Sequence, residues 1–196
     1  MVRRTRAEMA ATRASLIATA RQVFAESGYA DASMDELTAR AGLTRGALYH
    51  HFGDKQGLLA AVVAQIDAEI DDRLQAISDA AADNWQGFRS RCRAYLEMAL
   101  EPEYQRLVLR DARAVLGGAT LESQRLCVAS MAQLLDVLIK EGQVERAEPQ
   151  AIAALVYGSL AEAAFWIADS GATEARLQQA LAALDLLLRG LLRQRE

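Results

Sequence analysis

Residues 33–55 constrain the fold of this chain most strongly, because they hold two short helical patterns separated by a glycine turn. Ser33 is a good N-cap, and Glu36 three residues later completes the sequence pattern of a capping box. Gly42 can take the left-handed conformation that ends a helix, and Thr44 can cap the helix that follows. We therefore expect two short helices joined by a tight turn.

The second of these helices has two different faces. Leu48 and Phe52 share one face, which suits burial, whereas the opposite face carries Arg45, Gly46, Tyr49 and His50. Arginine, tyrosine and histidine can reach phosphates and base edges, and glycine permits a close approach. This pattern is typical of a helix-turn-helix motif whose second helix enters the major groove of DNA.

The same stretch resembles the N-terminal domain of the TetR family of transcriptional regulators. The family pattern is a small capped helix, an Ala-Gly turn and a helix that ends in Leu-Tyr-x-His-Phe with a lysine three residues on. Here it reads LYHHFGDK over residues 48–55. The resemblance in motif covers roughly residues 9–60. Beyond them it rests on the order and length of the helices.

The resemblance implies a DNA-binding surface made of Ser33, Thr44, Arg45, Gly46, Ala47, Tyr49, His50, His51 and Lys55. Arg45 is the best candidate for reading a base, since arginine can pair with guanine O6 and N7 together. Ser33 and Thr44 can bind phosphate as well as cap their helices, and Ala47 could touch a thymine methyl group. For His51 a packing or capping role stays open beside a phosphate contact.

Lys55 is locally unfavourable where it stands, because a cation in the first turn of a helix opposes the helix dipole. Asp54 before it is expected to cap that helix. A phosphate bound by the free backbone N–H groups and by the ammonium together would account for the lysine. We therefore expect Lys55 to contact the DNA backbone.

Charge is distributed unevenly along the chain. The net charge is −4, yet residues 1–55 carry 8 Lys and Arg against 6 Asp and Glu, and the remainder carries 14 against 20. A basic head on an acidic body suits a protein that binds DNA with one end. The arginines at positions 3, 4 and 6 could lie along the DNA backbone or form a solvated terminus.

Composition indicates an all-α fold, since 52% of the 196 residues are hydrophobic and only two are proline. We expect a three-helix helix-turn-helix DNA-binding domain over residues 1–53 and a helical ligand-binding and dimerisation domain over 54–196. About nine helices are expected, over residues 8–27, 33–41, 44–52, 54–79, 84–100, 102–116, 120–141, 149–169 and 173–193.

Several kinds of chemistry lack the residues that they need. The two histidines, His50 and His51, are adjacent on one helix, so they cannot hold one metal ion or serve a distant nucleophile. We expect no enzyme activity, no cofactor and no metal. Cys92 and Cys127 are expected to be small core residues and not a redox pair. No apolar run approaches the ~20 residues of a membrane span, and no secretory segment is evident, which favours the cytoplasm.

The last two helices carry an apolar stripe too wide for one neighbour. We expect them to pack on a second copy across a two-fold axis, with a buried hairpin of a monomer as the alternative. The predicted interface comprises Leu155, Gly158, Ser159, Glu162, Leu177, Leu181, Leu184 and Leu188.

Family members usually bind a small molecule in the C-terminal domain, and binding there lowers their affinity for DNA. The candidate lining comprises Trp85, Phe88, Tyr95, Met98, Arg110, Asp111, Met131, Glu162, Phe165 and Trp166. Each aromatic or methionine side chain of this set is more often plain core than pocket wall, because aromatics dominate helical cores. Arg110, Asp111 and Glu162 could anchor a ligand, form a structural pair or face water.

The sequence thus predicts a homodimeric transcriptional regulator, in the first instance a repressor, that binds a palindromic operator and is released by a small-molecule effector. The alternative is a helical small-molecule binding or interaction protein that no longer reads DNA.

Overall fold

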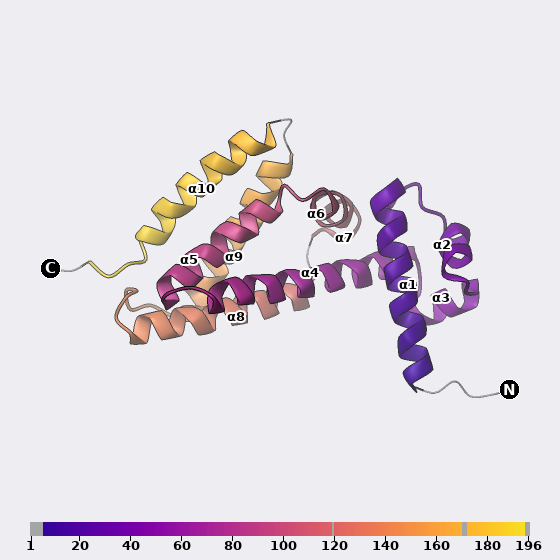
Figure 1. Ribbon diagram of the computed structural model, residues 1–196, viewed down its shortest axis with the longest axis horizontal. Coiled ribbons are helices and arrows are strands. Elements are labelled where there is room, and N and C mark those ends of the chain that lie inside the picture. The colour runs from indigo at the N-terminus through magenta and orange to yellow at the C-terminus, as the bar shows by residue number, and fades with distance from the viewer. Residues whose placement is uncertain (1–5, 119, 170–171, 195–196) are drawn as a thin grey trace. The chain divides into compact units, whose positions relative to one another are not determined.

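The described part of the chain is helical throughout, as predicted from the sequence (Figure 1). The structure is a computed structural model, and it describes residues 6–118, 120–169 and 172–194. The helices are α1 Arg6–Ser27, α2 Met34–Ala41, α3 Arg45–Phe52, α4 Lys55–Asp79, α5 Asn84–Met98, α6 Pro102–Tyr104, η1 Gln105–Ala112, α7 Arg113–Leu116, α8 Leu121–Lys140, α9 Pro149–Ala168 and α10 Thr173–Arg189. Since α6, η1 and α7 follow one another without a break, they correspond to one of the nine expected helices.

Contacts divide the chain into two compact units. The head unit holds the residues up to Ile66 together with 106–120, and the body unit holds 67–105 and the residues from Leu121 onward. Helix α4 contributes residues to both units. The boundary expected after residue 53 therefore falls inside the head unit. This unit also includes the segment 106–120, which is distant in sequence from the rest of it.

The head unit is built around the apolar side of α1. Leu16, Val23 and Phe24 of α1 are buried together with Leu37 of α2 and Leu48 of α3. The caps expected from the sequence determine where the short helices begin and end. Ser33 Oγ accepts the N–H of Glu36 at 3.1 Å, Thr44 Oγ1 accepts the N–H of Ala47 at 3.2 Å, and Gly42 ends α2 at φ 62°.

One detail of the expected capping box differs. The Glu36 carboxylate lies 3.2 Å from a guanidinium nitrogen of Arg40, which also binds Glu26 at 2.6 Å. The arginine four residues on thus binds Glu36 in place of the backbone N–H of Ser33. Arg40 fastens α2 to the end of α1.

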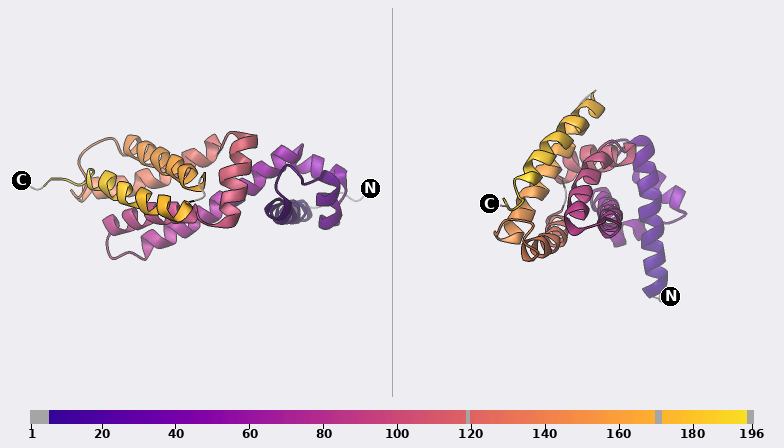
Figure 2. Two further views of the ribbon diagram at one scale, coloured as in Figure 1. Left: turned by 90° about the horizontal axis from the view of Figure 1, so that it is seen from above. Right: turned by 60° about the vertical axis from the view of Figure 1, so that its left-hand side comes forward.

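In the body unit, α8 and α9 run side by side, and α5 and α10 pack with them (Figures 1 and 2). Phe88 of α5, Leu135 of α8 and Ile167 of α9 are completely buried among them. Asp185 of α10 receives two hydrogen bonds from Arg89 and one from Arg93, all between 3.0 and 3.1 Å. Charged pairs at the rim and an apolar interior therefore hold α5 against α10.

The segment 102–116, expected as a single regular helix, contains a π-helical stretch at Gln105–Ala112. A π-helix is rare and short, and it often marks a functional position in a helix. Its residues have ordinary helical propensity, so the apolar periodicity gave no sign of the change.

Helix α9 corrects the expectation that no segment could span a membrane. It is the one helix among the described residues that is long and apolar enough to do so by length and composition. Of its most apolar stretch only 28% is buried. Because the helix packs in the body unit along one side, its other side is left as an exposed apolar surface.

The two cysteines are both shielded, as expected. Cys92 is completely buried, and burial raises the pKa of its thiol to about 12. Cys127 is half-buried, and burial raises its pKa to about 11. Neither thiol has the lowered pKa of a reactive cysteine.

Candidate nucleic-acid interface and effector site

The outer face of α3 is open to solvent. Thr44, Arg45, Gly46, Tyr49 and His50 are exposed, as is Ser33 at the start of α2. Leu48 on the opposite face is completely buried, and Phe52 is half-buried beneath the guanidinium of Arg13. The structure therefore brings most of the predicted DNA-binding residues onto one accessible surface.

Ala47 and His51 are less accessible than the other members of this set. Both are half-buried. The His51 ring lies 6.0 Å from the ring of Phe52 and 5.5 Å from that of His50, between ring centroids. This position suits the packing role that the sequence left open for His51.

Arg45 makes an ion pair that the sequence did not reveal. Its Nε lies 2.7 Å from Asp35 Oδ1, and a terminal nitrogen donates to Asp35 Oδ2 at 3.0 Å. Both side chains are more than half exposed, so the pair adds little to stability. Asp35 occupies the Nε and Nη2 edge of the guanidinium, so Arg45 would pair with a guanine either through its other edge or after leaving Asp35.

Lys55 has a structural partner in place of the phosphate that was expected to explain it. Its ammonium donates to the carbonyl oxygens of Tyr29 at 2.7 Å, Ala32 at 2.8 Å and Ala30 at 3.3 Å. It also lies 4.3 Å from the centroid of the Tyr29 ring. These contacts offset the unfavourable helix dipole, so the position of the lysine is explained without a phosphate, and its contact with DNA stays a prediction.

The loop held by Lys55 has further partners within the head unit. The N–H of Tyr29 donates to Asp111 Oδ2 at 2.9 Å. Gly28 begins the loop at φ 87°, and a Cβ there would lie 2.5 Å from a nitrogen of Arg106. Segment 106–120 thus secures the chain just before the helix-turn-helix motif.

Two of the candidate ligand anchors have other surroundings in the structure, and for Arg110 these match the alternative of facing water. Asp111 belongs to the head unit and binds the backbone of Tyr29, and Arg110 is exposed on the same π-helical segment. The sequence places Arg110 and Asp111 on an otherwise apolar helical segment, but it does not specify which elements pack against that segment. The segment packs with the head, although the chain reaches it after α5 of the body.

The aromatic part of the predicted ligand lining is scattered. Phe88, Met98 and Met131 are buried core residues, and Trp85 and Phe165 are half-buried. Glu162 is exposed, and Trp166 is 42% exposed with the guanidinium of Arg176 over its ring. Phe88, Met98 and Met131 thus occupy core positions, which is the alternative that the sequence favoured for the aromatic and methionine side chains.

Tyr95 does join a cluster, with polar partners that the sequence analysis missed. The Tyr104 hydroxyl donates to the Tyr95 hydroxyl at 3.2 Å. Burial raises the pKa of both tyrosines, and the charge of Asp67 adds to the shift. A signal was present: Val63, Ile70 and Leu74 of α4 are buried, and Asp67 falls on the same helical face. An aspartate among buried apolar residues of one helix face indicates that polar groups of other helices lie opposite it in the interior.

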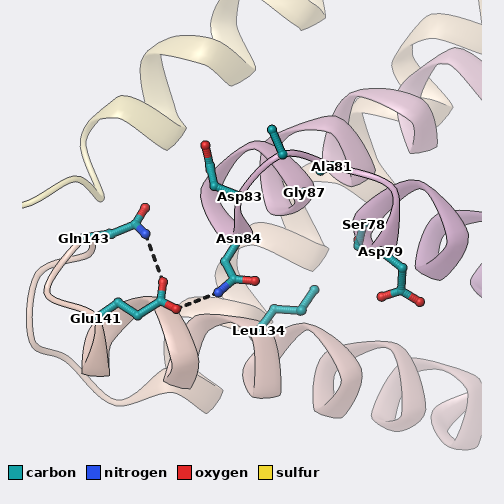
Figure 3. A pocket seen from close by; sticks show the side chains of 10 residues that line it. Ser78, Asp79, Ala81, Asp83, Asn84, Gly87, Leu134, Glu141 and Gln143 are labelled. Carbon is teal, nitrogen blue, oxygen red and sulfur yellow. Dashed lines mark hydrogen bonds between the residues drawn. The ribbon is translucent and has the colours of Figure 1, made fainter.

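A separate groove of about 600 Å³ opens on the body unit (Figure 3). It is lined by Ser78, Asp79, Ala81, Ala82, Asp83, Asn84, Gly87, Leu134, Glu141 and Gln143. Glu141 accepts hydrogen bonds from Asn84 at 2.6 Å and Gln143 at 2.9 Å across it. None of the predicted ligand residues lies here, and three of the groove's polar side chains, Asn84, Glu141 and Gln143, already bind one another.

The predicted dimer interface divides into two parts. On α9, Leu155, Gly158, Ser159 and Glu162 are exposed, with Leu155 at 77%. On α10, Leu177, Leu181, Leu184 and Leu188 are buried within their own unit, so assigning them to a partner was wrong. The outward side of α10 carries Leu186 and Leu187 instead, at 64% and 60% exposed.

Of the predicted basic arm, Arg3 and Arg4 lie outside the described residues. Arg6 is the first residue of α1 and is exposed.

Comparisons with known proteins agree with this arrangement. Residues 16–62 match the family described as bacterial regulatory proteins, tetR family. Residues 85–191 match the tetracyclin repressor-like C-terminal domain. The first stretch covers the helix-turn-helix region, and the second covers most of the body unit together with the segment 106–120 of the head unit.

Three individual proteins are informative. A TetR-family transcriptional regulator from Pectobacterium atrosepticum has a crystal structure with TM-score 0.93 and 72% identity, covering 98% of this chain and 100% of its own. The transposon Tn10 TetC protein of Escherichia coli is 28% identical over 146 residues, 74% of each chain. RolR, solved with the ligand resorcinol, shares the fold at TM-score 0.71 and 22% identity, covering 95% of this chain and 90% of that one.

These matches extend over both units, and the motif quoted from residues 48–55 lies on an exposed helix. The chain belongs to the TetR family of transcriptional regulators, which bind DNA and are not enzymes.

Proposed function

We propose that this chain is a cytoplasmic, homodimeric repressor that binds a palindromic operator and is released from it by a small-molecule effector. The observation that carries this proposal is the exposed face of α3, with Arg45 and Tyr49 outward over a completely buried Leu48. The likeness of the body to a tetracyclin repressor-like domain supports repression. The complex of RolR with resorcinol supports a small-molecule effector.

In this proposal residues 1–53 bind DNA, and 54–196 bind the effector and dimerise. Arg45 reads a base, and Gly46 and Ala47 let the helix lie close to the groove floor. Ser33, Thr44, Tyr49, His50 and His51 bind phosphates or base edges. The contact of Lys55 with a phosphate becomes secondary, because three carbonyl oxygens already hold its ammonium.

Dimerisation is needed because a two-fold operator is read by two copies of α3 about one DNA turn, roughly 34–36 Å, apart. The proposed interface is the exposed apolar side of α9 and α10, which includes Leu155, Trp166, Leu186 and Leu187. An exposed apolar patch on a soluble regulator is most simply covered by a second copy. Gly158 and Ser159 in the same stripe permit close approach.

Effector release would act through α4, whose residues belong to both units. A ligand that favours one conformation of the body changes operator affinity by its difference in affinity for the two conformations. We propose that α4 transmits this difference as a change in the spacing of the two reading helices.

The decisive experiment selects bound duplexes from a random DNA pool and then titrates the selected site with variants. Arg45→Ala should weaken binding by about 1–3 kcal/mol and relax preference at one base position. Asp35→Asn should strengthen binding by about 0.2–1 kcal/mol, because it removes the ion pair that competes for Arg45.

Equal affinity of Arg45→Ala and the unaltered protein for the selected site would refute the base-reading role. If no duplex is enriched at all, the alternative gains support, namely a helical small-molecule binding or interaction protein that no longer reads DNA.

A further inference from the structure

Polar side chains from five helices meet in the interior of the body unit. They are Asp67 of α4, Tyr95 of α5, Tyr104 of α6, Cys127 of α8 and Tyr157 of α9. The rings of Tyr95 and Tyr104 lie 6.4 Å apart at 77°, with their hydroxyls hydrogen-bonded at 3.2 Å. Burial is the main cause of the raised pKa of Tyr157 and of Cys127, followed by Tyr95 for the first and Asp71 for the second; the charge of Asp67 adds to both, which places them within its electrostatic reach. We call these five residues the tyrosine–carboxylate cluster.

Four members of the cluster are deep in the protein and yet partly accessible. Burial is the largest cause of the raised pKa of Tyr95, Tyr157, Cys127 and Asp67. Nevertheless, each of these four side chains keeps an intermediate solvent-accessible surface. The cluster is therefore largely enclosed by protein and is still reached by solvent.

Asp67 is the one member of the cluster that carries a formal charge. Its carboxylate accepts a hydrogen bond from Ser123, but the buried oxygen Oδ2 has no partner in the protein. Leaving a buried carboxylate oxygen without a donor is costly. A ligand that supplied a donor would remove that cost.

The nearest buried cation is already bound elsewhere. Arg91 is 3% exposed and donates to Asp71 at 2.6 Å, to Ser130 at 3.0 Å and to Gln75 at 3.3 Å. Asp71 lies one helical turn beyond Asp67 on α4, so the two carboxylates have different partners. The Nε of Arg91 has no partner among the described residues, and a cationic ligand would supply a positive charge to balance Asp67.

We propose that the tyrosine–carboxylate cluster binds the protonated amine of a small, largely apolar ligand, with Asp67 as the counter-ion and the tyrosine rings around the cation. Aromatic faces attract cations, and the attraction is strongest where water is excluded. An anionic ligand would be repelled by Asp67, and a neutral one would leave its charge unbalanced. The inference rests on the proposed function in one respect, that this ligand is the effector.

Three matched sets of compounds test the charge preference in the full chain: benzyl, naphthyl and anthracenyl methylamines, the corresponding alcohols and the corresponding carboxylates. Thermal unfolding and fluorescence titration report binding without DNA. At least one amine should raise the melting temperature and bind at least tenfold more tightly than its alcohol and its carboxylate. If no amine binds, or if an alcohol or carboxylate binds as tightly, the proposal is wrong.

Two variants locate the site. Asp67→Asn should lose at least tenfold in affinity for the amine, whereas Asp72→Asn, which removes an exposed carboxylate from the same helix, should not. Equal losses in the two variants would mean that only net charge matters and would overturn the assignment. The preference of the unaltered protein for amines is measured independently, so the test does not depend on the variants folding.

Release of the selected operator by the same amine is then measured separately. If the protein binds an amine but no duplex, the proposed function is wrong and the cation site is supported. If it binds an operator but no amine, the cation site is wrong and the proposed function is supported.

Discussion

At the scale of single residues, Lys55 shows how a site signature can have a structural cause. The lysine ends the motif quoted from residues 48–55, and its ammonium holds three carbonyl oxygens of the loop before α2. Any role in binding phosphate would compete with these contacts. The residue therefore positions the reading helices whether or not it touches DNA.

Replacing Lys55 by alanine should destabilise the protein. Loss of hydrogen bonds from a charged donor costs about 1–3 kcal/mol in the free energy of unfolding, which urea titration would measure. Lys140→Ala is a matched control, since Lys140 is 73% exposed and bound only to Asp136 within its own helix. If the two variants were equally stable but Lys55→Ala lowered the salt dependence of DNA binding, the original phosphate assignment would be restored.

Gly46 permits a test of close approach to DNA. A Cβ at this position would meet nothing nearer than Thr44 Oγ1 at 3.9 Å, so the fold itself does not require glycine. Gly46→Ala should stabilise the helix by up to about 1 kcal/mol and yet weaken operator binding. Thermal unfolding and operator titration on the same preparation measure both effects. Unchanged operator affinity would show that α3 does not approach the groove closely at this residue.

At the scale of elements, α4 is the helix whose residues serve both units. Its buried face passes through Leu59, Val63, Ile70 and Leu74, and Asp67 lies on that same face. An apolar residue at this position would stabilise the body more, so the aspartate is a local cost. Such a cost is expected where a helix also serves a binding site.

The pH dependence of stability follows from the position of Asp67. Burial raises its pKa in the folded protein. The stability that its protonated form allows is fully present below the unfolded pKa and is lost as pH rises through the folded pKa. Asp67→Asn should therefore raise the free energy of unfolding at neutral pH and reduce its fall above acidic pH.

Urea unfolding at several pH values measures this slope. Asp72→Asn serves as the control, because it removes the same formal charge from an exposed position on the same helix. The same pH slope in Asp67→Asn and in the unaltered protein would mean that Asp67 titrates normally.

At the scale of the whole molecule, the proposed dimer makes different demands on the two sides of α10. Leu184 is buried and Leu187 is 60% exposed on one helix. A charged residue at position 187 should weaken dimerisation and leave the folded protomer stable. A charged residue at position 184 should destabilise the fold itself.

The paired variant Leu186→Glu with Leu187→Glu should be a folded monomer with much weaker operator binding. Sedimentation measures its mass and circular dichroism its folding. Leu121→Glu is the control, since Leu121 is 71% exposed on α8. A dimer that survives the paired change, with operator affinity intact, would place the interface elsewhere.

Local sequence determined the elements of this protein. Caps such as Ser33 and Thr44, and a stop such as Gly42, act on backbone groups within a few residues, so helix positions could be predicted closely. The exposure of the face proposed to bind DNA followed from the same reasoning, because a short helix that buries one side leaves the opposite side to solvent. The motif on that helix was enough to indicate the family.

Tertiary structure decided which side of each longer helix meets which neighbour. Asp111 binds the backbone of Tyr29 in the head unit, and Lys55 binds carbonyl oxygens of the loop before α2. The leucines Leu177, Leu181, Leu184 and Leu188 of α10 are buried in the core of their own unit. The polar interior around Asp67 needed five helices to meet before it existed. Periodicity specifies that a helix has an apolar side, but partners distant in sequence specify what that side touches, and only the folded chain brings them together.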